Sequence, residues 1–259
     1  MIYTKTNVDF ISFFYVAILL TFYGCSSEEP FAFETQNFEA NTILDCEFET
    51  CATFRINLLT IHNERPVCKK INTEIEKVAC TILNVGENSS KDTLEAAILE
   101  FNNLYRDNKA TFPDETPSYE ASIHAELGFQ CKDIVSIVVD SYIFTGGAHG
   151  YGSMTFLNIE TKTGNRISNH DLFKNYTDFE TYAEKVFRST FNILEIESIN
   201  STGFFFENNT FRLPENIGCT NTHVILYYNP YEISSYADGP IEIKIKKEDV
   251  ASYFAYNIL

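Results

Sequence analysis

The sequence predicts an α+β fold in which helices pack on mostly antiparallel sheets in two modules. Two patterns alternate along the chain: stripes of apolar residues at helical spacing, and shorter runs in which apolar and polar residues alternate. Their order is strand, helices and strands, followed by strands, a helix and strands. Hydrophobic residues make up 44% of the chain, which is enough to fill a buried core.

The first module is expected over residues 40–150. Its patterns predict a strand, two helices and two long strands, at residues 49–61, 70–83, 92–108, 119–131 and 134–145. Asp92 and Glu95 have the spacing of a capping box, so the second helix is expected to begin there.

The second module is expected over residues 151–259. The same patterns predict a strand, a helix and three further strands, at residues 153–160, 177–194, 204–213, 223–228 and 241–245. Thr177 and Glu180 have the spacing of a capping box at the start of this helix.

The amino terminus has the pattern of an export signal. An apolar run over residues 10–20 is well short of the roughly 20 apolar residues that a spanning helix needs. Gly24 before Cys25 resembles the bacterial lipobox, in which the cysteine is diacylated and becomes the new N-terminus. The sequence therefore predicts a signal peptide over residues 1–24 and a lipid anchor on Cys25. A short transmembrane anchor is the alternative.

Residues 25–39 are expected to form a flexible tether, because their polar start cannot bury much surface. The run Ser26-Ser-Glu-Glu-Pro30 also resembles the surface-export signals of Bacteroidetes lipoproteins. The expected location is the bacterial envelope, at the outer membrane and exposed at the cell surface if this signal operates. Contact with the membrane is expected through the lipid.

The charge of the chain bears on its partners. With 19 basic and 36 acidic residues, its formal net charge is −17. Such a surface repels nucleic acids, so no nucleic-acid partner is expected. It attracts cationic proteins, although solubility alone is the explanation of the charge that we favour.

Seven cysteines fit an exported protein. With Cys25 lipidated, an even number remains, which suggests disulfides. The candidates are Cys46 with Cys51, and Cys131 with Cys219. The first pair is close enough in sequence to close a hairpin, and the members of the second pair lie beside predicted strands.

No catalytic residue, metal site or cofactor is predicted. The sequence lacks the nucleophile elbow and the zinc-protease, phosphate-loop and dinucleotide-binding motifs. Its five histidines are scattered without the spacing of metal ligands.

Two segments carry most of the functional signal: residues 141–150 (SYIFTGGAHG) and residues 227–240 (YYNPYEISSYADGP). In the first, glycines allow backbone angles that other residues avoid, and a histidine projects from a tight turn. In the second, tyrosines can bury their rings while their hydroxyls need partners. The candidate ligand-binding residues are Gly146, Gly147, His149, Gly150, Tyr231 and Tyr236.

Each segment also has a structural interpretation, which we favour. His149 would then bond to a neighbouring backbone group, since single histidines more often serve packing or capping. The tyrosines would pack the two modules together.

These segments, with Thr163-Gly164 and Asp171-Leu-Phe173 between them, closely resemble a paired domain of envelope proteins. Its halves are the domain-of-unknown-function families 4163 and 3298, and the resemblance covers most of residues 40–259. The pair also forms the extracytoplasmic part of lysozyme-sensing anti-sigma factors and lies beside the catalytic domain of some peptidoglycan deacetylases. The chain shows neither a sigma-binding region nor a separate deacetylase domain, so neither activity is carried over.

The resemblance implies an envelope module that binds a protein or a glycan. The first expectation is a lipoprotein that binds a cationic protein such as lysozyme. One alternative is an envelope enzyme or glycan-binding module that acts on peptidoglycan, with residues 146–150 in its site. Another is a structural lipoprotein without a soluble ligand.

Overall fold

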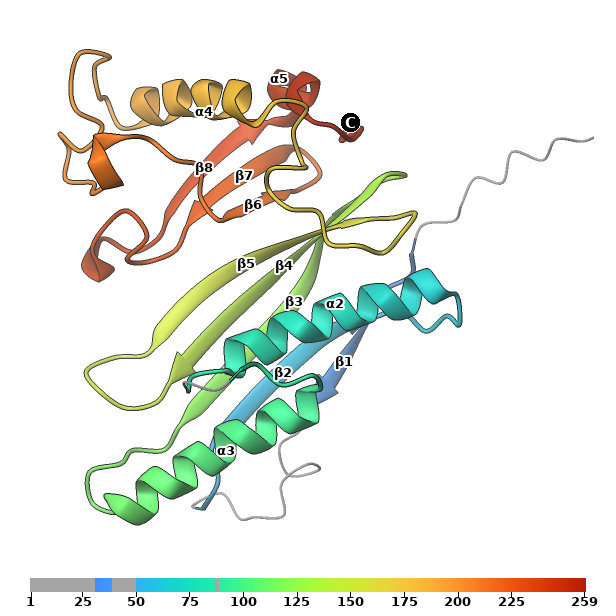
Figure 1. The fold of residues 1–259 in the computed structure, drawn as a ribbon, viewed down its shortest axis with the longest axis vertical. Helices are drawn as coiled ribbons and strands as arrows, with labels where there is room; N and C mark the ends of the chain where they lie inside the picture. Colours follow the sequence, from blue (N-terminus) through green and yellow to red (C-terminus); the bar gives the residue numbers. More distant parts are fainter. Residues whose placement is uncertain (1–30, 39–49, 87–88) are drawn as a thin grey trace, which may run out of the picture.

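The computed structural model describes residues 31–38, 50–86 and 89–259 (Figure 1). Within them, helices and two separate sheets form two modules, as the α+β prediction requires. The first module holds a five-stranded sheet and the second a three-stranded sheet.

The five-stranded sheet has the strand order β1-β2-β3-β4-β5. Its strands are β1 (Glu34–Phe38), β2 (Thr53–Thr60), β3 (Glu120–Gln130), β4 (Ile134–Phe144) and β5 (Tyr151–Glu160). All neighbours pair antiparallel except β2 and β3, which are parallel. A parallel pair needs a long crossover, and two helices supply it here.

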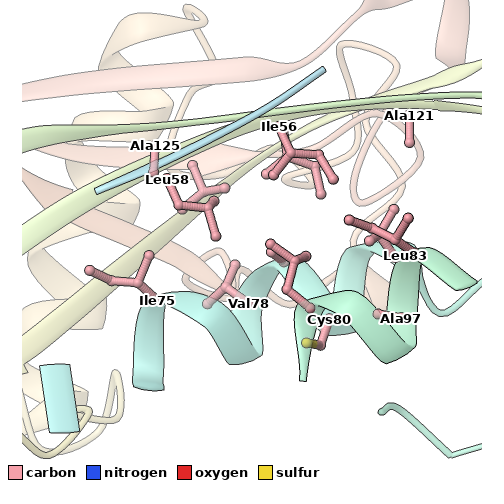
Figure 2. Close-up of a cluster of buried hydrophobic side chains, with 14 of the residues drawn as sticks. Ile56, Leu58, Ile75, Val78, Cys80, Leu83, Ala97, Ala121 and Ala125 are labelled. Carbon is pink, nitrogen blue, oxygen red and sulfur yellow. The ribbon is translucent and has the colours of Figure 1, made fainter. Parts of the chain in front are cut away.

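Those helices are α2 (Pro66–Leu83) and α3 (Leu94–Thr111), and both cover one face of the sheet (Figure 1). Pro66 stands in the first turn of α2, where its missing N–H is no loss. In Figure 2, Ile75 and Val78 of α2 face Leu58 of β2 across the apolar layer. Burial of such side chains drives the helices onto the sheet.

The second module consists of an antiparallel sheet under short helices. Its strands are β6 (Asn216–Cys219), β7 (His223–Tyr228) and β8 (Ile241–Lys246), and its helices are α4 (Tyr176–Thr190) and α5 (Lys247–Val250). Three single-turn 3₁₀ helices lie at Glu207–Asn209, Tyr236–Asp238 and Ala251–Tyr253. Its core is rich in aromatic rings; Phe173, for example, stacks on Phe179 at a centroid distance of 3.9 Å.

The second module packs on the face of the first sheet that the helices leave free. Ile137 and Leu157 belong to the core under the helices. Their neighbours point the other way: the Ser136 hydroxyl accepts from the Cys219 N–H, and the Phe156 ring lies against Gly218. A Cβ on Gly218 would lie 1.8 Å from this ring, so glycine is needed for the close approach.

Several sequence predictions need correction. The predicted tether of residues 25–39 includes β1, which pairs with β2 along the sheet edge. The boundary predicted after residue 150 falls before β5, although β5 belongs to the first sheet. Residues 204–213 are not a strand, because their aromatic side chains fill the core from irregular backbone that includes a 3₁₀ turn.

The helix caps also differ from prediction. Thr93, not Asp92, caps α3, because its side chain accepts from the Ala96 N–H. Asn175, not Thr177, caps α4 and accepts from two backbone N–H groups. In both cases a polar residue one or two positions away fits the turn better than the predicted cap.

Candidate functional site

The two segments singled out in the sequence meet where the modules join. Residues 145–150 connect β4 to β5, and residues 229–240 connect β7 to β8. The Asn229 carboxamide binds both main-chain groups of Met154: its Oδ1 accepts from the N–H at 2.8 Å, and its Nδ2 donates to the carbonyl at 3.0 Å. The Tyr151 hydroxyl donates to the Pro230 carbonyl at 3.3 Å.

His149 is fixed by this junction. Its ring stacks on Tyr236 with centroids 3.8 Å apart and planes 15° apart. Its Nδ1 lies 2.8 Å from the Gly150 carbonyl, which also accepts from the Tyr236 hydroxyl at 3.1 Å. The histidine therefore contacts a neighbouring backbone group, as in the structural interpretation, and helps to hold the two modules together.

The glycines of the first segment serve two different purposes. Gly146 and Gly147 have φ angles of 101° and 88°, which favour glycine. Gly150 does not have such an angle; a Cβ there would lie 2.4 Å from atoms of the Tyr142 ring. The prediction that all three glycines supply unusual backbone angles is therefore wrong for Gly150, which makes room for a ring.

A groove of about 440 Å³ lies beside this junction. Its floor is formed by β4 and β5 and its wall by β7 and the 229–240 loop. The lining residues include Asp140, Tyr142, Gly152, Tyr227, Pro230 and Tyr236. None of the lining residues is basic.

The groove is acidic and aromatic. Burial, and then the carboxylates of Asp140 and Glu242, raise the pKa of Tyr227, so its hydroxyl stays neutral near pH 7. Asp140 and Tyr142 both face the groove, because alternate residues of a strand point to the same side. Aromatic rings beside an exposed carboxylate are suited to hold a cation.

Tyr231 does not line this groove but follows Pro230, which does. The residue is 55% exposed and its ring centroid lies 5.5 Å from that of Tyr236. Its φ of 71° is uncommon for a residue other than glycine. The preceding Asn229 and the following Glu232 hold this turn, since the Asn229 N–H donates to the Glu232 carboxylate at 2.9 Å.

The structure brings His149, Gly150, Tyr231 and Tyr236 together and leaves Gly146 and Gly147 in the loop between β4 and β5, where Gly146 lies beside Pro117. Among the other groove residues, Tyr142 and Tyr227 belong to the two segments singled out in the sequence, whereas Asp140, Gly152 and Ser153 lie outside them. Strand alternation could have paired Asp140 with Tyr142, but nothing in the sequence places β7 beside β4.

The described cysteines test only part of the predicted disulfide pairing. Cys51 is disulfide-bonded, and its predicted partner Cys46 lies outside the described residues, as does Cys25. Cys131 and Cys219 are free thiols, so the predicted bond between them is wrong. The Cys131 thiol donates instead to the Asn257 carbonyl at 3.1 Å, while Cys219 lies buried in β6.

The residues that the structure describes contain no cluster of His, Cys, Asp or Glu that could hold a metal ion. No helix among them is long and apolar enough to cross a membrane.

Fold and groove together define a class: a two-module α+β protein with an acidic, tyrosine-lined groove where its modules join. Residues 170–248 match the DUF3298 family, described as a protein of unknown function. Residues 46–151 match the family described as deacetylase PdaC, while family 4163, expected for this half, is not found. Among curated proteins there is no significant match.

Solved structures of DUF3298 proteins share the fold. One from Bacteroides fragilis is 18% identical with a TM-score of 0.65, over 88% of this chain and 95% of that chain. One from Pseudomonas aeruginosa is 20% identical with a TM-score of 0.64, over 89% of this chain and 97% of that chain. Together the comparisons suggest an accessory module associated with the envelope.

Proposed function

We propose that this protein is an envelope-anchored lipoprotein that binds a cationic protein, such as a c-type lysozyme, through the tyrosine-lined groove. The observation that carries the proposal is the composition of the groove. Tyr142, Tyr227 and Tyr236 line it with Asp140, and no basic residue does.

Each part of the groove suits a lysine or arginine side chain. Tyrosine rings attract a cation over their faces, an effect of about 0.5–1 kcal/mol at exposed sites. Asp140 supplies a carboxylate for the same cation, while the nearby Glu242 carboxylate is already paired with Lys244 at 2.9 Å. The net charge of −17 would speed the encounter with a basic partner and make it sensitive to salt.

Cys25 would tether the module to the outer membrane, with residues 1–24 removed as a signal peptide. Lipid chains provide stable membrane attachment when two are present. A groove exposed at the cell surface would then meet proteins that arrive from outside.

A calorimetric titration of the purified protein, carrying Cys25→Ser to prevent lipidation, with a c-type lysozyme tests the proposal. We expect saturable one-to-one binding that weakens as the salt concentration rises. Flat heats at low and high salt would refute it.

A second candidate is a module that binds or acts on peptidoglycan glycan, favoured by the deacetylase PdaC match over residues 46–151. Tyrosine rings also stack on sugars. Titration with soluble peptidoglycan fragments, followed by mass spectrometry for lost acetyl groups, distinguishes binding from turnover. Unchanged fragments and no heat of binding would exclude this candidate.

A further inference from the structure

Gly152 has no structural need to be glycine. Among the three glycines in the described strands, Gly128 and Gly218 sit where a Cβ would lie 2.9 Å from the Cys219 carbonyl and 1.8 Å from the Phe156 ring. A Cβ on Gly152 would meet only the Ser141 carbonyl, at 3.8 Å. Its φ is not positive either. A glycine of this kind in a strand often marks the close approach of a ligand.

The main chain of Gly152 is open to the groove. Gly152 lines it on β5, the edge strand of the first sheet. In an antiparallel pair, alternate residues turn their N–H and C=O away from the partner strand. Met154 turns both groups outward to Asn229, so Gly152, two residues earlier, turns both outward as well.

The neighbouring outward positions are occupied. Asn229 covers Met154, and the Gly150 carbonyl holds the Tyr236 hydroxyl and the His149 ring. In the described part of the chain, no group outside the sheet binds the N–H or C=O of Gly152. The N–H and C=O of Gly152, at the edge of β5, are therefore open to the groove, next to Tyr142 and Tyr236.

We infer that Gly152 pairs through its main chain with one extended residue of a bound peptide segment, whose basic side chain reaches Asp140. This inference rests on the proposed function and names the part of the partner that enters the groove. An extended residue presents its N–H and C=O to the same side, as strand addition requires. The acetamido group of a sugar points these two groups in opposite directions and could satisfy only one of them.

The test uses two capped peptides of equal charge: trilysine, and trilysine methylated on the backbone nitrogen of its central lysine. In ¹⁵N-labelled protein carrying Cys25→Ser, we expect trilysine to shift the Gly152 amide resonance and to slow its exchange with solvent. The methylated peptide should bind about tenfold more weakly, because it lacks one donor. Equal affinities, or a Gly152 amide that does not respond, would overturn the inference.

Two variants repeat the test from the protein side. Gly152→Pro removes the outward N–H without breaking a ladder bond and should weaken trilysine binding, whereas Gly152→Ala keeps the N–H. Circular dichroism checks that both fold. If lysozyme binds both variants alike, the inference fails and the proposed function stands.

If diacetylchitobiose shifts the Gly152 amide and trilysine does not, the site recognises sugar and the inference is wrong.

Discussion

Single glycines decide how closely the two modules approach. Gly218 of β6 lies directly under the Phe156 ring of β5, and Gly128 lies under the Cys219 carbonyl. These contacts leave no room for a methyl group. Interiors packed this tightly respond to even one added carbon.

Gly218→Ala should therefore destabilise the protein by about 1–3 kcal/mol, as overpacking does. Gly152→Ala is the matched control, since the nearest atom to its Cβ would be 3.8 Å away. Thermal unfolding followed by calorimetry measures both. An equal melting temperature for Gly218→Ala and the wild type would show that the modules are packed less closely than described.

Glu232 shows how one side chain shapes the groove wall. Its carboxylate accepts from the Glu215 N–H at 3.0 Å and the Asn229 N–H at 2.9 Å. Burial raises the pKa of Glu232, and these two hydrogen bonds oppose the rise. The group thus links the start of β6 to the turn that carries Tyr231.

Among the secondary-structure elements, the positions of the helices were easier to predict than the residues at which they begin. The apolar stripes located α2, α3 and α4, because a buried helical face repeats every three to four residues. Their caps were misassigned, since Asp92, Thr93 and Asn175 all have side chains that can cap. Only the backbone path decides which of them reaches a free N–H.

Thr93→Ala should cost about 0.5–1 kcal/mol, because it removes the oxygen that accepts from Ala96 at the start of α3. Asp92→Ala, at the residue predicted from sequence, should cost less. Chemical denaturation of both variants compares them. A larger loss for Asp92→Ala would restore the predicted capping box.

The irregular parts of the chain were the least predictable. Residues 204–213 alternate like a strand, yet Phe206 and Phe211 are buried from irregular backbone. β1 was missed because it is short and polar and pairs with a strand further along the chain, and β6 was missed because it is only four residues long. The groove was predicted in part: its two segments were evident, but Asp140 of β4 and Gly152 of β5 lie outside them.

At the scale of the whole molecule, side-chain amides join the modules along the edge of β5. Asn229 binds Met154, and the Asn216 side chain accepts from the Phe156 N–H at 3.2 Å. Such pairing also covers a strand edge that could otherwise recruit another chain. The junction therefore holds the modules together and sets the limits of the groove.

Asn229→Ala should speed hydrogen exchange at Met154 and lower stability by about 1–2 kcal/mol, because two main-chain groups lose their partners. Asn221→Ala, in the exposed turn between β6 and β7, is the control. Hydrogen exchange followed by mass spectrometry measures the protection of the main-chain amides in both variants. Unchanged protection of the peptide that contains Met154 would mean that the junction does not depend on this amide.

The proposed capture of a cationic protein depends on the groove and not merely on the acidic surface. Asp140→Lys and Glu195→Lys change the net charge of −17 equally, but only Asp140 lines the groove. Calorimetric titration of both variants with a c-type lysozyme separates the two effects. We predict that Asp140→Lys weakens binding at least about tenfold while Glu195→Lys has a small effect. Equal affinities for the two variants would show that the groove does not bind the cationic protein.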